Sequence, residues 1–200
     1  MINLTNKDDV KDLVESCIKG NRKSQELLYK TFYGKMLVVC MRYSRNREEA
    51  QDVLHDGLIK VFSKLKSFEN KGSFEGWVRR IIVNVAIDRV RSRKDFYINE
   101  EQEFLLDNIV DESDDVAELD DVAELEKIKK MNAETIIELM QKLSPSYRAV
   151  LNLFAVENMQ HKEIAETLNI SIGTSKSNLA KAKVKLKELL EQYRDKLEYE

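Results

Sequence analysis

Apolar residues recur along most of this chain at the spacing of one face of an α-helix. In the N-terminal part the pattern predicts four helices, over residues 4–20, 24–43, 47–68 and 73–94. In the C-terminal part it predicts three more, over residues 143–159, 161–169 and 171–190. A single proline and six glycines in 200 residues also favour long helices over a turn-rich β fold. The sequence therefore predicts an all-α fold.

Capping residues support the expected helix ends in the N-terminal part. Thr5 or Asn6 can cap the first helix, and Gly20 ends it. Ser73 can cap the fourth helix, which carries an apolar stripe of Phe74, Trp77, Val78, Ile81, Ile82 and Val85. Because Trp77 lies on this stripe, we interpret it as a core residue rather than as an exposed platform for stacking.

The C-terminal segment has the pattern of a helix-turn-helix. Ser144 followed by Pro145 is a strong helix start. The next helix ends near Asn169, a residue type that tolerates the left-handed backbone of a sharp turn, and Ser171 can cap the last helix. On the exposed face of that last helix we place Thr174, Asn178, Lys181 and Lys185. The alternative is an ordinary helical hairpin.

The net charge of −3 conceals an uneven distribution. Residues 1–94 carry a net charge of +8, residues 95–126 carry −14, and residues 127–200 carry +3. Because salt screens charges beyond about 8 Å, a basic domain can bind nucleic acid beside an acidic segment. We therefore divide the chain into two basic helical domains, 1–94 and 131–200, and an acidic linker, 95–130.

Other features narrow the class of protein. No apolar run is long enough to span a membrane and the first residues lack a secretory signal, so we expect a cytoplasmic protein. Cys17 and Cys40 fall within apolar helical patterns and are predicted to be reduced core residues. His55 and His161 lie in different segments, and no metal-ligand cluster or phosphate-binding loop is evident. We therefore expect no catalytic residue, metal site, cofactor or small-molecule substrate.

Three segments, taken in order, resemble the ECF (extracytoplasmic function) group of bacterial RNA polymerase sigma factors, in the sigma-70 superfamily. They are "EEAQDVLHDGLIKVFSKL", "SFENKGSFEGWVRRIIVNVAIDRVRSRK" and "LSPSYRAVLNLFAVENMQHKEIAETLNISIGTSKSNLAKAKVKLKELL". The resemblance covers nearly the whole chain and implies two helical domains, sigma region 2 and sigma region 4. It implies a transcription initiation factor, not an enzyme, with core RNA polymerase and promoter DNA as partners. Many members of the group also bind an anti-sigma factor, and we expect the free protein to be a monomer.

The resemblance also implies roles for particular residues. For binding core polymerase it implies Asp52, His55, Asp56 and Ile59. The loop from Phe68 to Ser73 and the helix residue Asn84 would line a pocket for a base flipped out of the −10 element. All residues expected at −10 DNA are Phe68, Asn70, Lys71, Gly72, Arg80, Asn84, Asp88, Arg91, Arg93 and Lys94. Those expected at the −35 element are Thr174, Ser175, Lys176, Asn178, Lys181 and Lys185. Asparagine prefers adenine edges, so Asn178 suggests a contact to adenine.

Two other classes of protein explain less of the sequence. A dimeric helix-turn-helix repressor or activator leaves residues 1–94 unexplained and needs a dimerisation helix with sustained heptads, which we do not find. An enzyme needs a cluster of catalytic groups, and the sequence shows none. For the acidic linker three hypotheses remain open: it mimics nucleic acid in the polymerase channels, it folds back on the basic domains, or it is a solvated tether.

Overall fold

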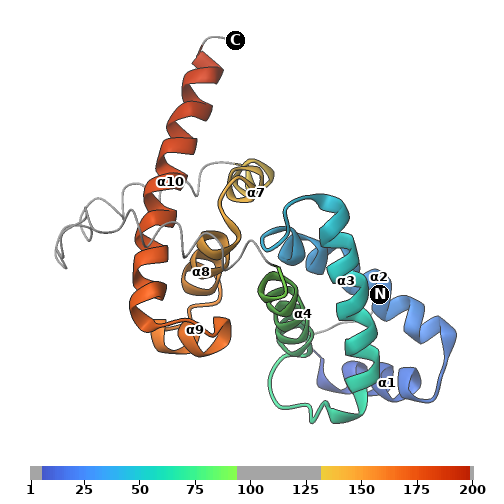
Figure 1. Cartoon of the computed structure of the whole chain (residues 1–200). Helices are drawn as coiled ribbons and strands as arrows, with labels where there is room; N and C mark the ends of the chain where they lie inside the picture. The colour runs from blue at the N-terminus through green and yellow to red at the C-terminus, as the bar shows by residue number, and fades with distance from the viewer. Residues whose placement is uncertain (1–5, 94–131, 199–200) are drawn as a thin grey trace. The chain divides into compact units, whose positions relative to one another are not determined.

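The structure is a computed structural model that describes residues 6–93 and 132–198. Every regular element in these two stretches is a helix, which confirms the predicted all-α fold (Figure 1). The chain divides into two compact units, residues 1–90 and 91–200. The predicted linker, 95–130, and Lys94 lie outside the described residues. Among the described helices, none has the length and hydropathy needed to cross a membrane.

Five helices make up the described part of the N-terminal unit (Figure 1). They are α1 (Lys7–Ile18), α2 (Arg22–Met41), α3 (Arg47–Lys64), the short 3-10 helix η1 (Leu65–Ser67) and α4 (Phe74–Arg91). Asn6 is the N-cap of α1, and its Oδ1 accepts a hydrogen bond from the Asp8 N–H at 2.9 Å. The predicted cap of α4 is also confirmed, because Ser73 Oγ accepts from the Gly76 N–H at 2.9 Å.

An aromatic cluster anchors the start of α4 in the core of this unit. Phe74 is 2% exposed, and its ring meets the ring of Phe32 edge-on with centroids 5.6 Å apart. Trp77 stacks on Phe74 at 5.8 Å. Phe68 tilts against Phe74 and Trp77, at 4.9 Å and 5.3 Å. Trp77 packs in this cluster as expected, but it is only half-buried and so is not the fully buried core residue that was predicted.

The two cysteines are buried and free, as predicted. Burial raises the pKa of the Cys17 thiol above its usual value, and it raises the pKa of Cys40 to about 12. The thiolate is the reactive form of cysteine, so neither side chain is a nucleophile at neutral pH. Both cysteines therefore act as small apolar residues of the core.

A glycine in α3 makes room for a side chain of α4. Gly57 is buried, and a Cβ atom built on it would lie 2.5 Å from the Ile82 Cδ1 atom and 3.6 Å from the Ile82 Cα atom. A contact of 2.5 Å is far inside the optimal separation of carbon atoms, about 3.5–4.0 Å. The absence of a side chain at Gly57 therefore lets Ile82 fill the space between the two helices.

We expect the overpacking caused by Gly57→Ala to cost about 1–3 kcal/mol of the free energy of unfolding, against a gain of up to about 1 kcal/mol in helix propensity, so the net effect is a loss. Combining it with Ile82→Val, which removes the clashing Cδ1 atom, should recover part of this loss. Denaturant unfolding followed by Trp77 fluorescence measures both effects. Gly34→Ala is the matched control, because a Cβ atom added to that helical glycine would meet nothing within 4 Å. It should instead stabilise by up to about 1 kcal/mol, and a similar gain at Gly57 would contradict the packing argument.

The described part of the C-terminal unit contains four helices (Figure 1). They are α7 (Ala133–Gln141), α8 (Pro145–Ala155), α9 (His161–Leu168) and α10 (Ile172–Glu198). Helix α7 was not predicted from the sequence, although Asn132 caps it by accepting the Glu134 N–H at 3.2 Å. Ser144 and Pro145 begin α8 as predicted, and Asn169 takes the left-handed conformation, with φ of 58°. Helix α10 packs against both α8 and α9, so the helix-turn-helix is part of a compact unit.

Candidate nucleic-acid and polymerase interfaces

One face of α3 is available to a partner. Asp52, His55, Asp56 and Ile59 are spaced i, i+3, i+4 and i+7, so they share one side of the helix, and all four are exposed. Ile59 is 55% exposed, which is high for a large aliphatic side chain. The opposite side of α3 holds the core residues Ala50, Val53, Leu54, Leu58 and Val61. The structure thus brings together the four residues predicted to bind polymerase, and we call them the α3 face.

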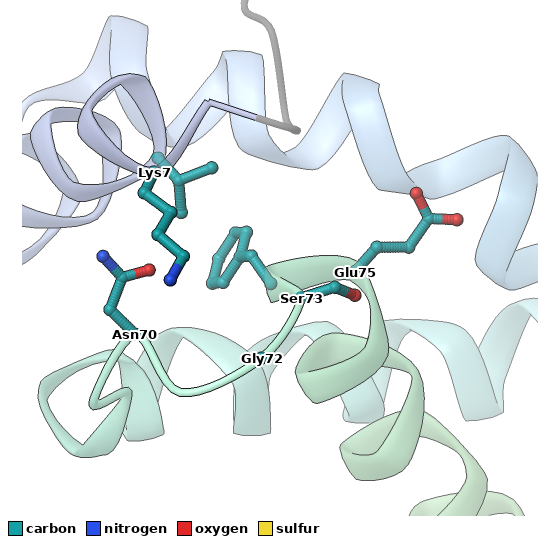
Figure 2. A pocket seen from close by; sticks show the side chains of 7 residues that line it. Lys7, Asn70, Gly72, Ser73 and Glu75 are labelled. Carbon is teal, nitrogen blue, oxygen red and sulfur yellow. The ribbon is translucent and has the colours of Figure 1, made fainter.

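The loop between η1 and α4 borders a hollow of about 460 Å³, which we call the first hollow. Helix α1 contributes Lys7 and Val10 to its lining, and the loop contributes Asn70, Gly72 and Ser73 (Figure 2). Phe74, from the aromatic cluster, also lines it. The hollow therefore lies between two segments that are about sixty residues apart in the sequence.

The backbone of this loop has an unusual conformation. Asn70 has φ of 56° and Gly72 has φ of 83°, both in the left-handed region. Asparagine and glycine are the residue types that adopt this region at least cost, and such conformations are frequent at functional sites. In Figure 2 the side chains of Asn70 and Lys7 point toward one another across the first hollow. The loop conformation thus places the Asn70 amide where an occupant can meet it.

A second hollow, of about 420 Å³, adjoins the first along α1. Asn70 lines both hollows. Helix α1 contributes a lysine to each of them, Lys7 to the first hollow and Lys11 to the second. The second hollow also contains Glu15, Lys66, Phe68 and Glu69. Glu69 forms an ion pair with Lys71, with 2.6 Å between Lys71 Nζ and Glu69 Oε2. Of the loop residues predicted to contact −10 DNA, Phe68, Asn70 and Gly72 therefore line hollows and Lys71 lies on the surface beside them.

Asn84 belongs to a different surface from the loop. It is exposed on α4 and lines neither hollow, so these hollows do not form the predicted pocket shared by the loop and Asn84. Arg80, Asp88 and Arg91 are exposed on the same helix. Asp88 lies 3.7 Å from the Lys60 ammonium, which offsets its negative charge. Arg93 is half-buried. Helix α4 thus presents a polar stripe that is predominantly basic.

Four of the six residues predicted to contact the −35 element are accessible. Lys176 and Lys185 are exposed, and Thr174 and Lys181 are half-exposed. The Ser171 hydroxyl accepts from the Thr174 N–H at 2.9 Å, as expected of the cap of α10. Lys185 is ion-paired with Glu188 at 2.8 Å, but both side chains remain about half-exposed. The accessible face of α10 is therefore rich in lysine.

The other two residues predicted to contact the −35 element, Ser175 and Asn178, are buried. Their exposed fractions are 0% and 4%, so neither side chain belongs to the accessible face. They share a buried stripe of α10 with Leu179 and Ala182, which faces the rest of the unit. The prediction that Asn178 lies on the exposed face of α10 is wrong, and this arrangement leaves neither Ser175 nor Asn178 accessible for the predicted base contacts. The helical period counted from Leu179 and Ala182 includes both positions, but the polarity of Ser175 and Asn178 favoured an exposed placement.

A hydrogen bond links the two helices of the helix-turn-helix. His161 Nδ1 lies 2.9 Å from Ser175 Oγ, and the His161 ring stacks on Phe154 with centroids 5.1 Å apart. This contact joins the first residue of α9 to the buried side of α10. It was not predicted from the sequence, because the two residues are fourteen positions apart.

Burial, together with the positive charges of Lys176 and Lys183, lowers the pKa of His161 below its usual value of 6.5. We expect the ring resonances of His161 to titrate below pH 6.5 by NMR. Lys176→Gln and Lys183→Gln should each raise this pKa, whereas Lys142→Gln, at the C-cap of α7, should not. As the pH falls, His161 is protonated in the unfolded state before it is protonated in the folded state. The contribution of the neutral His161 ring to the free energy of unfolding is therefore complete above pH 6.5 and is lost as the pH falls through the folded pKa. A titration at or above pH 6.5 would contradict burial and lysine charge as the cause of the shift.

Comparison with known proteins identifies the family of this chain. The family model "Sigma-70 region 2" matches residues 28–96, and "Sigma-70, region 4" matches residues 133–186. The chain is 29% identical over 181 residues to the ECF RNA polymerase sigma factor SigW of Bacillus subtilis, covering 90% of this chain and 96% of SigW. It is 26% identical over 185 residues to the RNA polymerase sigma-H factor of Pseudomonas aeruginosa, covering 90% and 92%.

A solved complex gives a more distant match. The sigma factor RpoE of Bartonella quintana, determined with the anti-sigma factor NepR, aligns with a TM-score of 0.47 and 20% identity, covering 83% of this chain and 96% of RpoE. The two family models occur in the expected order and together match more than half of the residues. The chain belongs to the ECF-type sigma factors of the sigma-70 family, which are transcription initiation factors rather than enzymes.

Proposed function

We propose that this protein binds core RNA polymerase through the α3 face, reads the −35 element with α9 and α10, and opens the −10 element with its N-terminal unit. In this proposal residues 1–94 act as sigma region 2 and residues 131–200 act as sigma region 4. The first hollow is the observation that carries the opening step. It lies beside a loop whose backbone is held in left-handed conformations, and its lining combines apolar and polar groups.

The opening step needs a site for a base that has left the duplex. Removing a base from the stack costs a few kcal/mol, which a fitting site offsets only when the base is extruded. The first hollow offers the amide of Asn70, which can both donate and accept hydrogen bonds, above a floor that includes the buried side chains of Val10 and Phe74. Its volume of about 460 Å³ is within the range of small-ligand sites. The basic stripe of α4, with Arg80 and Arg91, then supports the strand that carries the base.

In this proposal the accessible lysines of α10 bind the duplex at the −35 element. A recognition helix enters the major groove, and lysines on its surface neutralise phosphates. Lys176, Lys181 and Lys185 are accessible for this role, with Thr174 at the start of the helix. Ser175 and Asn178 are buried and support the helix from behind. This division assigns affinity to the lysines and leaves base readout to the exposed positions near the N-terminus of α10.

Run-off transcription tests this function directly. Purified core polymerase from the same organism would transcribe fragmented genomic DNA with and without this protein. We expect new, sharply positioned starts that share two upstream sequence motifs. Starts without a common upstream motif would contradict promoter recognition. A failure to bind core polymerase would contradict the role of the α3 face, and a dimeric mass in that case would favour the repressor alternative.

A further inference from the structure

We propose that α1 is a DNA-binding element, in which Lys7 holds a backbone phosphate of the nucleotide whose base occupies the first hollow. This inference rests on the proposed opening function, and it assigns to the first helix a part in strand capture. Neither Lys7 nor any other residue of α1 was among the residues expected at −10 DNA. Lys7 enters the site only because the fold brings α1 against the loop between η1 and α4.

The charges around the first hollow leave Lys7 as its effective cation. Glu75 also lines this hollow, but its carboxylate lies 2.7 Å from the Lys35 ammonium, and in Figure 2 its side chain points away from Lys7. Among the described residues, no carboxylate lies within ion-pair distance of Lys7. The first hollow therefore combines one available positive charge with a carboxylate that another lysine already offsets. An occupant that carries a negative charge is favoured there.

Helix stability does not explain the lysine. Lys7 is the first residue of α1, where a positive charge opposes the helix dipole at a cost of about 0.3–1 kcal/mol. The next two residues, Asp8 and Asp9, are the acidic residues that this position favours. A residue that is locally unfavourable and that lines a hollow is a candidate for function. The second hollow repeats the arrangement, with Lys11 one helical turn further along α1.

The side chains of Asn70 and Lys7 suit different parts of one nucleotide. The Asn70 amide offers a donor and an acceptor in a fixed plane, which suits the edge of a base. The Lys7 ammonium is a point charge with three donors on a flexible stem, which suits a phosphate. The two side chains face one another across the hollow (Figure 2), so one nucleotide can meet both. Val10 and Phe74 also line the hollow, but they are 3% and 2% exposed, so they form part of its floor and offer little contact area.

Salt dependence of binding tests the phosphate contact. The probe is a fork of a promoter found by the transcription experiment, duplex at the −35 element and single-stranded at the −10 element, bound by holoenzyme. Each phosphate contact to a single strand contributes about 0.7 to the slope of log Kobs against log salt. We therefore expect Lys7→Gln to reduce that slope by about 0.7 and to weaken binding about fivefold at about 0.1 M salt. Lys7→Arg should retain both values.

Two controls separate this contact from a general effect of charge. Lys23 is an exposed lysine in the first turn of α2, and it lines neither hollow. Lys23→Gln should therefore leave the slope of log Kobs against log salt unchanged. A duplex version of the same promoter, kept closed at low temperature, should bind wild-type holoenzyme and Lys7→Gln holoenzyme equally. An equal loss on fork and duplex, or an equal loss for Lys23→Gln, would overturn the assignment of Lys7 to the captured nucleotide.

A double-mutant cycle places the contact in the first hollow. Asn70→Gly keeps a residue that tolerates the left-handed backbone but removes the side chain. If Lys7 and Asn70 hold one nucleotide, the double variant should lose less affinity for the fork than the product of the fold-losses of Lys7→Gln and Asn70→Gly. Fully multiplicative losses would overturn the shared site. A wild-type holoenzyme that binds the fork no better than the duplex would overturn the proposed function itself, whereas normal fork binding by Lys7→Gln would overturn only this inference.

Discussion

Replacing Phe74 with alanine is expected to lower the free energy of unfolding of the N-terminal unit by about 3–5 kcal/mol. Phe74 is 2% exposed and its ring contacts the rings of Phe32, Phe68 and Trp77. Alanine removes this burial and leaves a cavity that three aromatic neighbours cannot readily fill. Trp77 is the only tryptophan of the chain and stacks on Phe74, so its fluorescence reports unfolding of this unit.

Two variants make the Phe74 result specific. Phe74→Leu keeps most of the apolar volume, and we expect a loss of about 1 kcal/mol, near the usual cost of a change of shape in a core. Phe154→Ala removes a phenylalanine that is 38% exposed in the C-terminal unit, and it should leave the Trp77 transition unchanged. If Phe74→Ala shifted that transition no more than Phe154→Ala, the aromatic cluster would not be the anchor of α4.

Most of the helices could be predicted because each depends on neighbouring residues. Ser73 and Asn6 cap their helices through bonds that span two or three residues, and such signals are visible in a sequence. The left-handed Asn169 is likewise a local matter of backbone sterics. Helix α7 was missed, although Asn132 gives it a cap of the same kind. It lies within the predicted C-terminal domain, 131–200, but the strong start at Ser144 and Pro145 marked the beginning of the first helix predicted there.

The faces of α10 show the limit of sequence reasoning about sites. Ser175 and Asn178 are polar, and polarity alone favours an exposed position. Their burial depends on where α8 and α9 lie, and the contact between His161 and Ser175 depends on the angle of the turn at Asn169. Leu179 and Ala182 did mark the buried stripe, and strict use of the helical period from these two residues would have included Ser175 and Asn178.

The first hollow illustrates a second limit, which is distance along the chain. The loop and its left-handed positions could be inferred from Asn70 and Gly72, but its other wall comes from α1. Patterns among neighbouring residues cannot predict that Lys7 and Asn70 line the same hollow. The one available signal was a lysine at the first position of a helix, where its charge is unfavourable. Gly57 is similar, because its role depends on Ile82 lying 2.5 Å from the place that a Cβ atom would take.

Ile59→Glu is expected to weaken binding to core polymerase at least about 30-fold, the effect of losing an interface hot spot of about 2 kcal/mol. Ile59 is 55% exposed at the C-terminal end of the α3 face, one helical turn after the exposed Asp56. An exposed aliphatic side chain ringed by polar groups is the usual centre of an interface, where the rim excludes water. Glutamate removes the apolar contact and places a charge where desolvation is costly.

The measurement is the equilibrium dissociation constant of the labelled protein for core polymerase, with unfolding of the variant followed by Trp77 fluorescence. Because Ile59 contributes little to the core, the unfolding transition should be unchanged, and lost binding can then be ascribed to the interface. Leu27→Glu, at a position 40% exposed on α2, introduces the same charge outside the α3 face and should bind nearly as tightly as wild type. Wild-type affinity of Ile59→Glu would remove the α3 face from the proposed mechanism, because burial of Ile59 is the contact that distinguishes docking there from long-range attraction by Asp52 and Asp56.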